Sequence, residues 1–203
     1  SVLFEEITRL PEYYPTRAER QVLRRRAVTV ARLTGARTLV ELGSGASEKT
    51  RLLLDALRRQ GTLVCYAPQD VDPTALVAAG RRLVADYPGL RVAATVADLE
   101  VELAVPDGPR PRLVAFLGGT LGNLDAEQRT AFYRAVRAVL DATDALLLGV
   151  DLVKDPRVLV RAYDDAAGVT AEFDRNLLRV LNRELDARFD PASFEHRALW
   201  NPA

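Results

Sequence analysis

The chain has 203 residues, of which 48% are hydrophobic and 28% charged, so it is long enough for one domain with a substantial core. Its 28 basic and 28 acidic residues give a formal net charge of zero, which argues against a general attraction to nucleic acid or membrane surfaces. One cysteine, Cys65, and one histidine, His196, exclude a disulfide framework and a histidine-rich metal site.

No targeting segment is recognisable in the chain. We find no signal peptide and no apolar run of ~18 residues, and therefore expect a cytoplasmic enzyme. We expect Cys65 to be a buried, inert thiol and His196 to be a surface or packing residue. Because the chain opens with Ser1 in mid-pattern and contains no methionine, we expect a fragment or a processed start.

The predicted elements alternate between helices and strands. A possible capping box at 16–19 starts a helix that runs to about Leu33. In chain order, the strands are expected at 38–42, 62–67, 90–96, 112–117 and 145–151, and further helices at 47–61, 72–87 and 125–140. This repetition predicts a parallel sheet with helices on both faces. A long helix at 168–189 lies outside the alternation, and the turn-rich stretch 105–112 is too short to divide domains.

Ligands of such sheets bind beyond the carboxyl ends of the strands, near the point where the strand order reverses. The residues after each predicted strand are therefore the candidates for a binding site. They are Gly43-Ser44-Gly45, Asp70, Asp98, the stretch 118–123 and Asp151.

The glycine turn in "ELGSGASEKT", at 41–50, does not match the phosphate-binding patterns. Counted from Gly43, both the P-loop and the dinucleotide fingerprint require glycine at position 48, but the residue there is Glu48. A carboxylate would repel phosphate, and the backbone freedom of glycine is lost. A nucleotide-binding or NAD-dependent enzyme is therefore the less favoured hypothesis.

S-adenosylmethionine has a ribose but no pyrophosphate, and the strand-end residues suit it. Glu41 suits its cationic groups, and the glycines let the backbone approach its amino-acid end. Asp70 can accept both ribose hydroxyls, while Asp98 and the apolar Leu99 can hold the adenine. Structural roles remain open for each acid: Glu41 as a partner of the next helix, Asp70 as a helix cap, and Asp98 as a solvated loop residue.

Four longer stretches carry a resemblance to a known family. They are "LFEEITRLPEYYPTRAE", "LVELGSGASEKTRLLLDAL", "FLGGTLGNL" and "LLGVDLVKDPRVLVRAYDDAAGVTAEFDRNLLRVLNREL", within a match that runs from about Leu3 to Asn201. The chain resembles the histidine-specific, S-adenosylmethionine-dependent methyltransferases. These enzymes trimethylate the α-amine of L-histidine to hercynine in ergothioneine biosynthesis. The resemblance implies a class I methyltransferase fold, an α/β Rossmann-like doubly wound sheet.

The resemblance also implies site residues, although it names no certain catalytic residue and no metal ligand. For the cofactor S-adenosylmethionine it points to Gly43, Lys49, Asp70, Asp98 and Leu99, the last at a position where the family commonly has an aromatic residue. For the substrate L-histidine it points to Tyr13, Asn123 and Tyr163, with Phe4 and Gly118 shaping the same pocket. From the residues alone, the two tyrosines also suit a hydrophobic core, and Asn123 also suits a helix entry.

We expect residues 1–203 to form a single methyltransferase domain. About 1–35 would be its N-terminal helical part, and 152–203 a helical substrate-binding insertion. Five strands are visible where this fold usually has seven, and the chain stops at "RALWNPA", so the C-terminal strands of the family are expected to be absent. We expect a monomer with a small-molecule substrate and with no nucleic-acid or membrane partner.

Two further hypotheses stay open at this stage. The chain could methylate another small amine on the same scaffold, or it could be a non-catalytic fragment that binds S-adenosylmethionine. The groups that hold the imidazole in the family lie in its later part.

Overall fold

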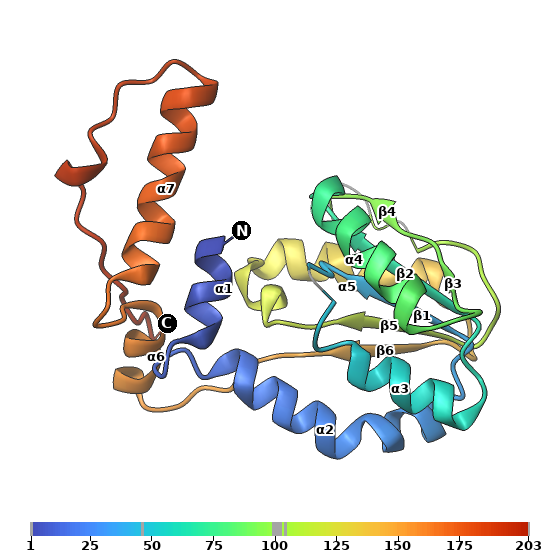
Figure 1. Cartoon of the computed structure of the whole chain (residues 1–203). Coiled ribbons are helices and arrows are strands. Elements are labelled where there is room, and N and C mark those ends of the chain that lie inside the picture. Colours follow the sequence, from blue (N-terminus) through green and yellow to red (C-terminus); the bar gives the residue numbers. More distant parts are fainter. Residues whose placement is uncertain (1, 46, 99–102, 104, 203) are drawn as a thin grey trace. The chain divides into compact units, whose positions relative to one another are not determined.

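The computed structural model describes residues 2–45, 47–98, 103 and 105–202 (Figure 1). The chain divides into two compact units. The first, here called the sheet unit, consists of residues 19–151, and the second, here called the helical unit, consists of residues 1–18 and 152–203. All strands in the described part of the chain belong to the sheet unit.

The sheet unit contains one sheet of six parallel strands. They are β1 (Thr38–Leu42), β2 (Cys65–Asp70), β3 (Arg91–Val92), β4 (Thr95–Val96), β5 (Arg112–Phe116) and β6 (Ala145–Leu148). The strand order is β3-β2-β1-β5-β6, and β4 also pairs with β2. The predicted parallel sheet is confirmed, and β1 and β5 are buried along their whole lengths.

The limits of the second strand differ from those predicted. β2 begins at Cys65 rather than at residue 62, because its neighbour β1 begins at Thr38 and the pairing starts with Thr38 opposite Cys65. The strand consequently ends at Asp70, at the same edge of the sheet as the turn that follows β1.

The predicted strand at 90–96 is divided into β3 and β4. The backbone carbonyls of Tyr66 and Asp70 in β2 accept hydrogen bonds from the N–H groups of Ala93 and Ala97. Pro68 lies between them on the same side of β2 and has no N–H to donate. The ladder is therefore interrupted there, and the edge of the sheet consists of two short strands.

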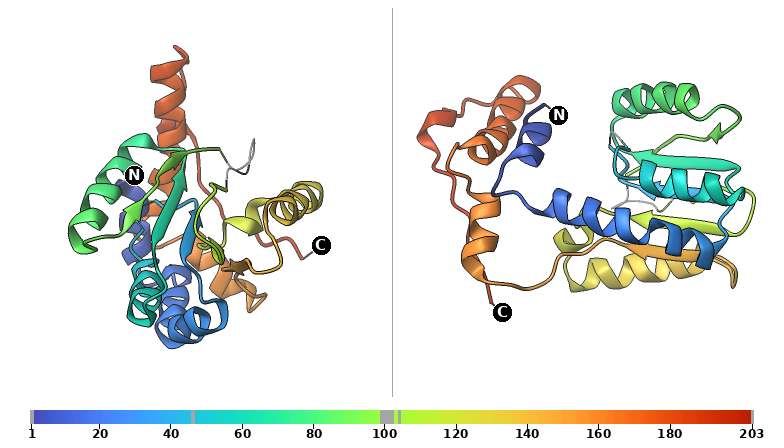
Figure 2. Two further views of the ribbon diagram at one scale, coloured as in Figure 1. Left: turned by 90° about the vertical axis from the view of Figure 1, so that its right-hand side faces the viewer. Right: turned by 60° about the horizontal axis from the view of Figure 1, so that its bottom comes forward.

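Helices cover both faces of the sheet, as the alternation predicts (Figure 2). They are α2 (Pro15–Thr34), which begins in the helical unit, α3 (Arg51–Gln60), α4 (Pro73–Asp86) and α5 (Ala126–Val139). Residues of α2, α3 and α4 pack against Leu39, Tyr66 and Leu113 on one face. Phe132 and Val136 of α5 pack with residues of the other face.

The helix ends show which local signals hold. Gly61 ends α3 with a left-handed φ of 79°, and the Asp72 side chain accepts the N–H groups of Thr74 and Ala75 at the start of α4, which are the roles that these residue types favour at helix ends. The predicted start of α2 is too late in the chain. The helix begins at Pro15, which places Thr16 inside the first turn instead of at the cap.

The helical unit contains α1 (Val2–Arg9), α6 (Pro156–Tyr163), α7 (Val169–Glu184) and a short 3₁₀ turn, η2 (Pro191–Ser193). The long helix predicted at 168–189 ends at Glu184 because the Asn182 side chain binds both the N–H and the carbonyl of Phe189, each at 2.8 Å, so the chain reverses.

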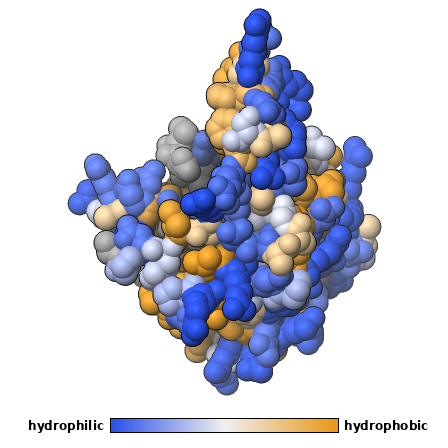
Figure 3. All heavy atoms as spheres, turned by 90° about the vertical axis from the view of Figure 1, so that its left-hand side faces the viewer, coloured by the Kyte–Doolittle hydropathy of each residue, from blue (hydrophilic) through white to orange (hydrophobic). Residues whose placement is uncertain are grey.

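Figure 3 shows apolar residues (orange) among hydrophilic ones on one face of the molecule.

Within the described residues, no helix has the length and apolar character needed to cross a membrane. The same part of the chain contains no group of three or more His, Cys, Asp or Glu side chains arranged to hold a metal ion. Cys65 is buried, as expected. The His196 ring lies against Asp174 and the Tyr163 carbonyl, which is the packing role predicted for it.

Candidate functional site

The glycine turn after β1 has the backbone conformation that its glycines permit. Gly43 and Gly45 have φ values of 65° and 50°, which an L side chain rarely adopts. The N–H of Ser44 donates to the carbonyl of Gln69 at 2.8 Å, so the turn is fastened to the end of β2. Gly43 is exposed, and its backbone is open to a ligand.

Asp70, the last residue of β2, holds the same turn from the side. Its Oδ2 accepts the N–H of Gly45 at 2.7 Å, and its Oδ1 accepts the N–H of Asp72 at 3.1 Å. Asp72 itself caps α4, so the helix-cap interpretation of Asp70 is wrong. A carboxylate has about four acceptor positions, so two remain for the hydroxyls of a ligand.

Asp98 follows a backbone segment that is paired with Asp70. Val96 of β4 is paired with Asp70, and the N–H of Ala97 donates to the Asp70 carbonyl at 3.1 Å. Asp98 follows directly and is exposed. Leu99, the predicted neighbour on the adenine, lies outside the described residues.

Lys49 follows the glycine turn beyond β1, and its side chain lies near the carboxyl end of β5. Its ammonium forms an ion pair with the Glu19 carboxylate of α2, and Glu19 Oε1 accepts the N–H of Gly118, just beyond β5, at 2.8 Å. A Cβ at Gly118, whose φ is 87°, would lie 3.5 Å from Lys49 Nζ. Lys49 and Gly118, predicted for cofactor and substrate respectively, are therefore neighbours.

Glu41 lies beneath the turn and has protein partners. It is 3% exposed, and its two carboxylate oxygens accept the hydroxyls of Thr50 and Tyr66. Tyr66 Oη also lies 2.8 Å from Ser47 Oγ. Burial raises the pKa of Glu41 to about 7, against the opposing effect of these hydrogen bonds and of Lys49. The structural interpretation of Glu41 is therefore the one that its contacts support.

We expect this buried acid to make stability depend on pH. The folded chain holds the Glu41 proton more tightly than the unfolded chain, because the pKa rises from 4.5 to about 7 on folding. The contribution of Glu41 to the free energy of unfolding is therefore full below pH 4.5 and is lost as the pH rises through about 7. Relative to Glu41→Gln, the wild-type free energy of unfolding should fall by on the order of 2 kcal/mol between these limits.

Denaturant unfolding of both proteins at several pH values measures this difference. Glu48→Gln, which removes a surface carboxylate from the same segment, is the control and should show no such trend. A difference between wild type and Glu41→Gln that stays constant from pH 4.5 to pH 8 would mean that Glu41 ionises normally in the fold.

The predicted substrate residues fall into two groups. In the helical unit, the rings of Tyr13 and Tyr163 meet edge to face with centroids 5.8 Å apart, and Phe4 lies 6.3 Å from Phe173. Tyr13 is buried, whereas Tyr163 is 47% exposed, so the core interpretation holds for Tyr13 only.

In the sheet unit, Gly118 and Asn123 lie on the loop after β5. Asn123 ends a 3₁₀ turn, η1 (Thr120–Asn123), and its side chain is exposed. The helix-entry interpretation of Asn123 is wrong, because Asp125 caps α5 together with Gln128 in a capping box.

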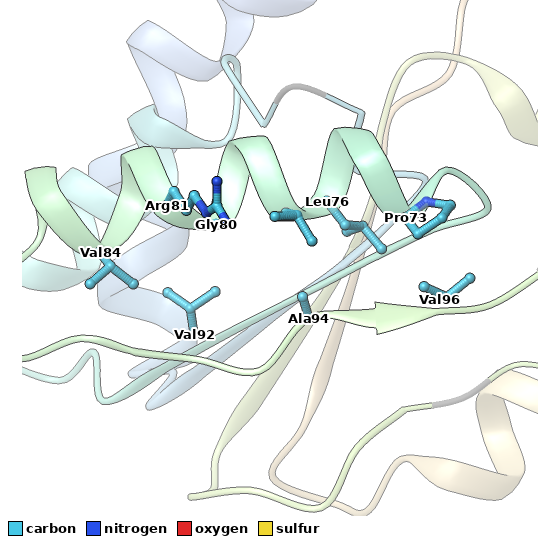
Figure 4. A pocket seen from close by; sticks show the side chains of 9 residues that line it. Pro73, Leu76, Gly80, Arg81, Val84, Val92, Ala94 and Val96 are labelled. Carbon is cyan, nitrogen blue, oxygen red and sulfur yellow. The ribbon is translucent and has the colours of Figure 1, made fainter.

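An apolar groove of about 510 Å³ lies elsewhere on the sheet unit, between α4 and the strands β3 and β4 (Figure 4). Pro73 and Val96 lie at one end and Val84 and Val92 at the other. Its lining is aliphatic apart from Arg81. The acids and the lysine named above are absent from this lining, so the groove does not offer the polar groups that an amino-acid or ribose ligand needs.

Three residues of the candidate site carry no site signal in the sequence: Glu19, Tyr66 and Gly149. In the sequence, Glu19 fits a capping box, and Tyr66 lies inside a predicted strand. Gly149 lay inside the strand predicted at 145–151, which ends at Leu148. A glycine in a strand pattern marks a close approach of other atoms, and here the Glu19 carboxylate occupies the space that a Cβ would need.

Comparisons with known proteins show the family and the fold of the chain. Residues 1–203 match the family model described as histidine-specific methyltransferase, SAM-dependent. Histidine N-alpha-methyltransferase of Mycobacterium tuberculosis (strain CDC 1551 / Oshkosh) is 54% identical over 204 residues, which cover 100% of this chain and 63% of that protein. Ergothioneine biosynthesis protein 1 of Neurospora crassa is 32% identical over 188 residues, covering 89% of this chain and 21% of that protein.

Among solved structures, an S-adenosylmethionine-dependent methyltransferase from Clostridium acetobutylicum superposes with a TM-score of 0.52 at 12% identity, over 73% of this chain and 56% of that one. This likeness shows the class I, Rossmann-like fold. The chain spans 63% of the length of its mycobacterial relative. Because the family model covers the whole of it, the chain belongs to the family of histidine-specific, S-adenosylmethionine-dependent methyltransferases.

Proposed function

We propose that this chain forms the cofactor-binding part of an enzyme that trimethylates the α-amine of L-histidine to hercynine in ergothioneine biosynthesis. The observation that carries the proposal is the strand-end cluster in a family member: Asp70 holds the glycine turn beyond β1, and Lys49 lies beside Gly118 beyond the neighbouring parallel strand β5. The names of the mycobacterial and Neurospora relatives support the substrate and the pathway.

The residues present fit S-adenosylmethionine. The left-handed glycines keep the turn free of side chains. Asp70 retains acceptor capacity for the two ribose hydroxyls, and Lys49 brings a positive charge for a carboxylate. Gly43, Lys49, Asp70 and Asp98 would hold the cofactor, with Leu99 against the adenine, and no phosphate-binding glycine is needed at position 48.

For the substrate, we propose Asn123 and Gly118 of the sheet unit and Tyr13, Tyr163 and Phe4 of the helical unit as binding residues, each set taken within its own unit. The Asn123 amide both donates and accepts hydrogen bonds, which suits a zwitterionic amino acid. Tyrosine hydroxyls can bind the carboxylate or the amine, and their rings tolerate a methylammonium group through cation–π attraction.

When bound, S-adenosylmethionine supplies a methyl group that is already activated by a positively charged sulfur. The protein groups then have to hold the neutral α-amine in line with that methyl group, at ~3–3.5 Å. Positioning of this kind accounts for much of the rate in such reactions. A pocket that retains the partly methylated amine would permit three successive transfers.

A methylation assay tests the proposal. The chain is incubated with S-adenosylmethionine and L-histidine, and mass spectrometry follows the addition of one, two and three methyl groups. Tryptophan and other amino acids serve as alternative substrates, which separates histidine methylation from action on another small amine. Cofactor binding without any methylated product would identify a binding fragment.

Asn123→Ala should separate substrate binding from cofactor binding. We expect the affinity for histidine to fall about tenfold or more, because a hydrogen bond to a charged group is lost. The affinity for S-adenosylhomocysteine should stay unchanged. Asn176→Ala, at an exposed position on α7, is the control. Calorimetric titration measures both ligands, and an equal loss for the two would show that Asn123 acts through the fold.

A further inference from the structure

Glu19 reaches the carboxyl ends of two strands from a distant helix. The side chain starts on α2, and its Oε1 accepts the Gly118 N–H beyond β5 at 2.8 Å. Gly149 follows β6, and a Cβ there would lie 3.2 Å from the Glu19 Cδ and closer still to its Oε1. The glycine at 149 therefore leaves room for the carboxylate, which the Gly118 N–H holds by a hydrogen bond.

The Glu19 carboxylate forms an ion pair with the Lys49 ammonium. Glu19 Oε2 pairs with the Lys49 ammonium, and the two side chains are only 16% and 22% exposed. Both charges also act on buried Glu41, since Lys49 lowers and Glu19 raises the pKa of that acid. The pair thus lies inside the strand-end cluster, where solvent screens it less than an ion pair on the surface.

A carboxylate and an ammonium held side by side complement a zwitterion. An α-amino acid group presents an ammonium to the carboxylate and a carboxylate to the ammonium. Each oxygen of Glu19 uses one of its acceptor positions in the contacts above, and Lys49 has three donors. Both side chains therefore keep capacity for a ligand without breaking their own pair.

We propose that Glu19 is an additional cofactor-binding residue, which takes the α-ammonium of the amino-acid end while Lys49 takes its carboxylate. The inference rests on the proposed function, because it assigns the ligand at the same site. It adds a residue from α2 to a cofactor set that otherwise comes from the turn and the strand ends. It also gives the Gly118 N–H bond and Gly149 a purpose, which is to keep the Glu19 carboxylate in position.

Two ligands test the proposal by calorimetric titration. S-adenosylhomocysteine carries the amino-acid end, whereas 5′-methylthioadenosine has the same nucleoside without it. Glu19→Gln keeps the size of the side chain and an oxygen for the Gly118 N–H but loses the charge. We expect it to raise the Kd of S-adenosylhomocysteine about tenfold or more and to leave that of methylthioadenosine within about twofold.

Three further variants control the comparison. Glu48→Gln removes an exposed charge one residue from Lys49, and both affinities should stay as in the wild type. Gly149→Ala displaces the Glu19 carboxylate without changing any charge, and it should weaken S-adenosylhomocysteine selectively. Asp70→Ala should weaken both ligands, because both contain the ribose.

The outcomes distinguish the inference from the proposed function. If the wild type binds both ligands and Glu19→Gln weakens neither, or weakens both equally, the role of Glu19 is overturned while the cofactor site stands. If the wild type binds neither ligand, the cofactor site itself is wrong, and the inference fails with it.

Discussion

Gly43→Val should abolish cofactor binding while leaving the sheet unit folded. Gly43 has a φ of 65°, and a β-branched residue is strongly disfavoured in that conformation. The turn must rearrange, which disturbs the hydrogen bonds that fasten Ser44 to Gln69 and Gly45 to Asp70. We expect the affinity for S-adenosylhomocysteine to fall at least ~1000-fold, about 4 kcal/mol.

Gly89→Val provides the matched control for this prediction. Gly89 also has a left-handed φ, of 82°, but it lies between α4 and β3, at the opposite end of the strands from the glycine turn. Both substitutions should cost about 1–3 kcal/mol in the free energy of unfolding. Circular dichroism beside calorimetric titration measures the two effects. Loss of the fold in Gly43→Val alone would indicate a purely structural glycine.

Asp144→Ala should destabilise the fold more than any surface substitution. Asp144, before β6, accepts hydrogen bonds from the Arg112 backbone N–H at 2.7 Å and from its guanidinium at 2.7 and 3.0 Å. The side chains of Arg112 and Asp144 are 2% and 0% exposed. Without the carboxylate, the buried guanidinium loses its counter-charge, and we expect a loss of about 3–5 kcal/mol.

Asp141→Ala is the control for the buried pair. Asp141 forms an ion pair with Arg110 at 2.5 Å, but its side chain is 45% exposed, so its removal should cost less than about 1 kcal/mol. Denaturant unfolding measures both variants. Replacing Arg112 and Asp144 together by Met and Leu should be milder than Asp144→Ala, because no charge is left buried. Equal stability of the two Asp→Ala variants would refute the argument.

Local features of this chain follow from residues that are near one another in sequence. The alternation of apolar runs, the end of α3 at Gly61 and the cap of α4 at Asp72 depend on a few successive residues. The absence of a glycine at position 48 excludes phosphate-binding turns for the same reason. Such signals can be found without coordinates because the backbone preference of a residue acts on its own segment.

The limits of the strands, unlike these local features, depend on neighbours that are remote in sequence. β2 starts where β1 can pair with it, and the edge strand is divided because Pro68 on β2 cannot donate to it. A hydrophobic run in the sequence shows that a strand exists, but the partner strand decides how much of the run is paired.

The sequence by itself therefore determined the parallel α/β sheet, the glycine turn, the place of Asp70 at the end of a strand and the family to which the chain belongs. Only the tertiary structure decided that Glu41 is buried beneath the turn and that Glu19 faces Lys49 and Gly118. Glu19 and Gly118 are separated by 99 positions, and Glu41 and Tyr66 by 25. No local preference encodes these contacts, because packing of the helices onto the sheet brings the side chains together and excludes water from them.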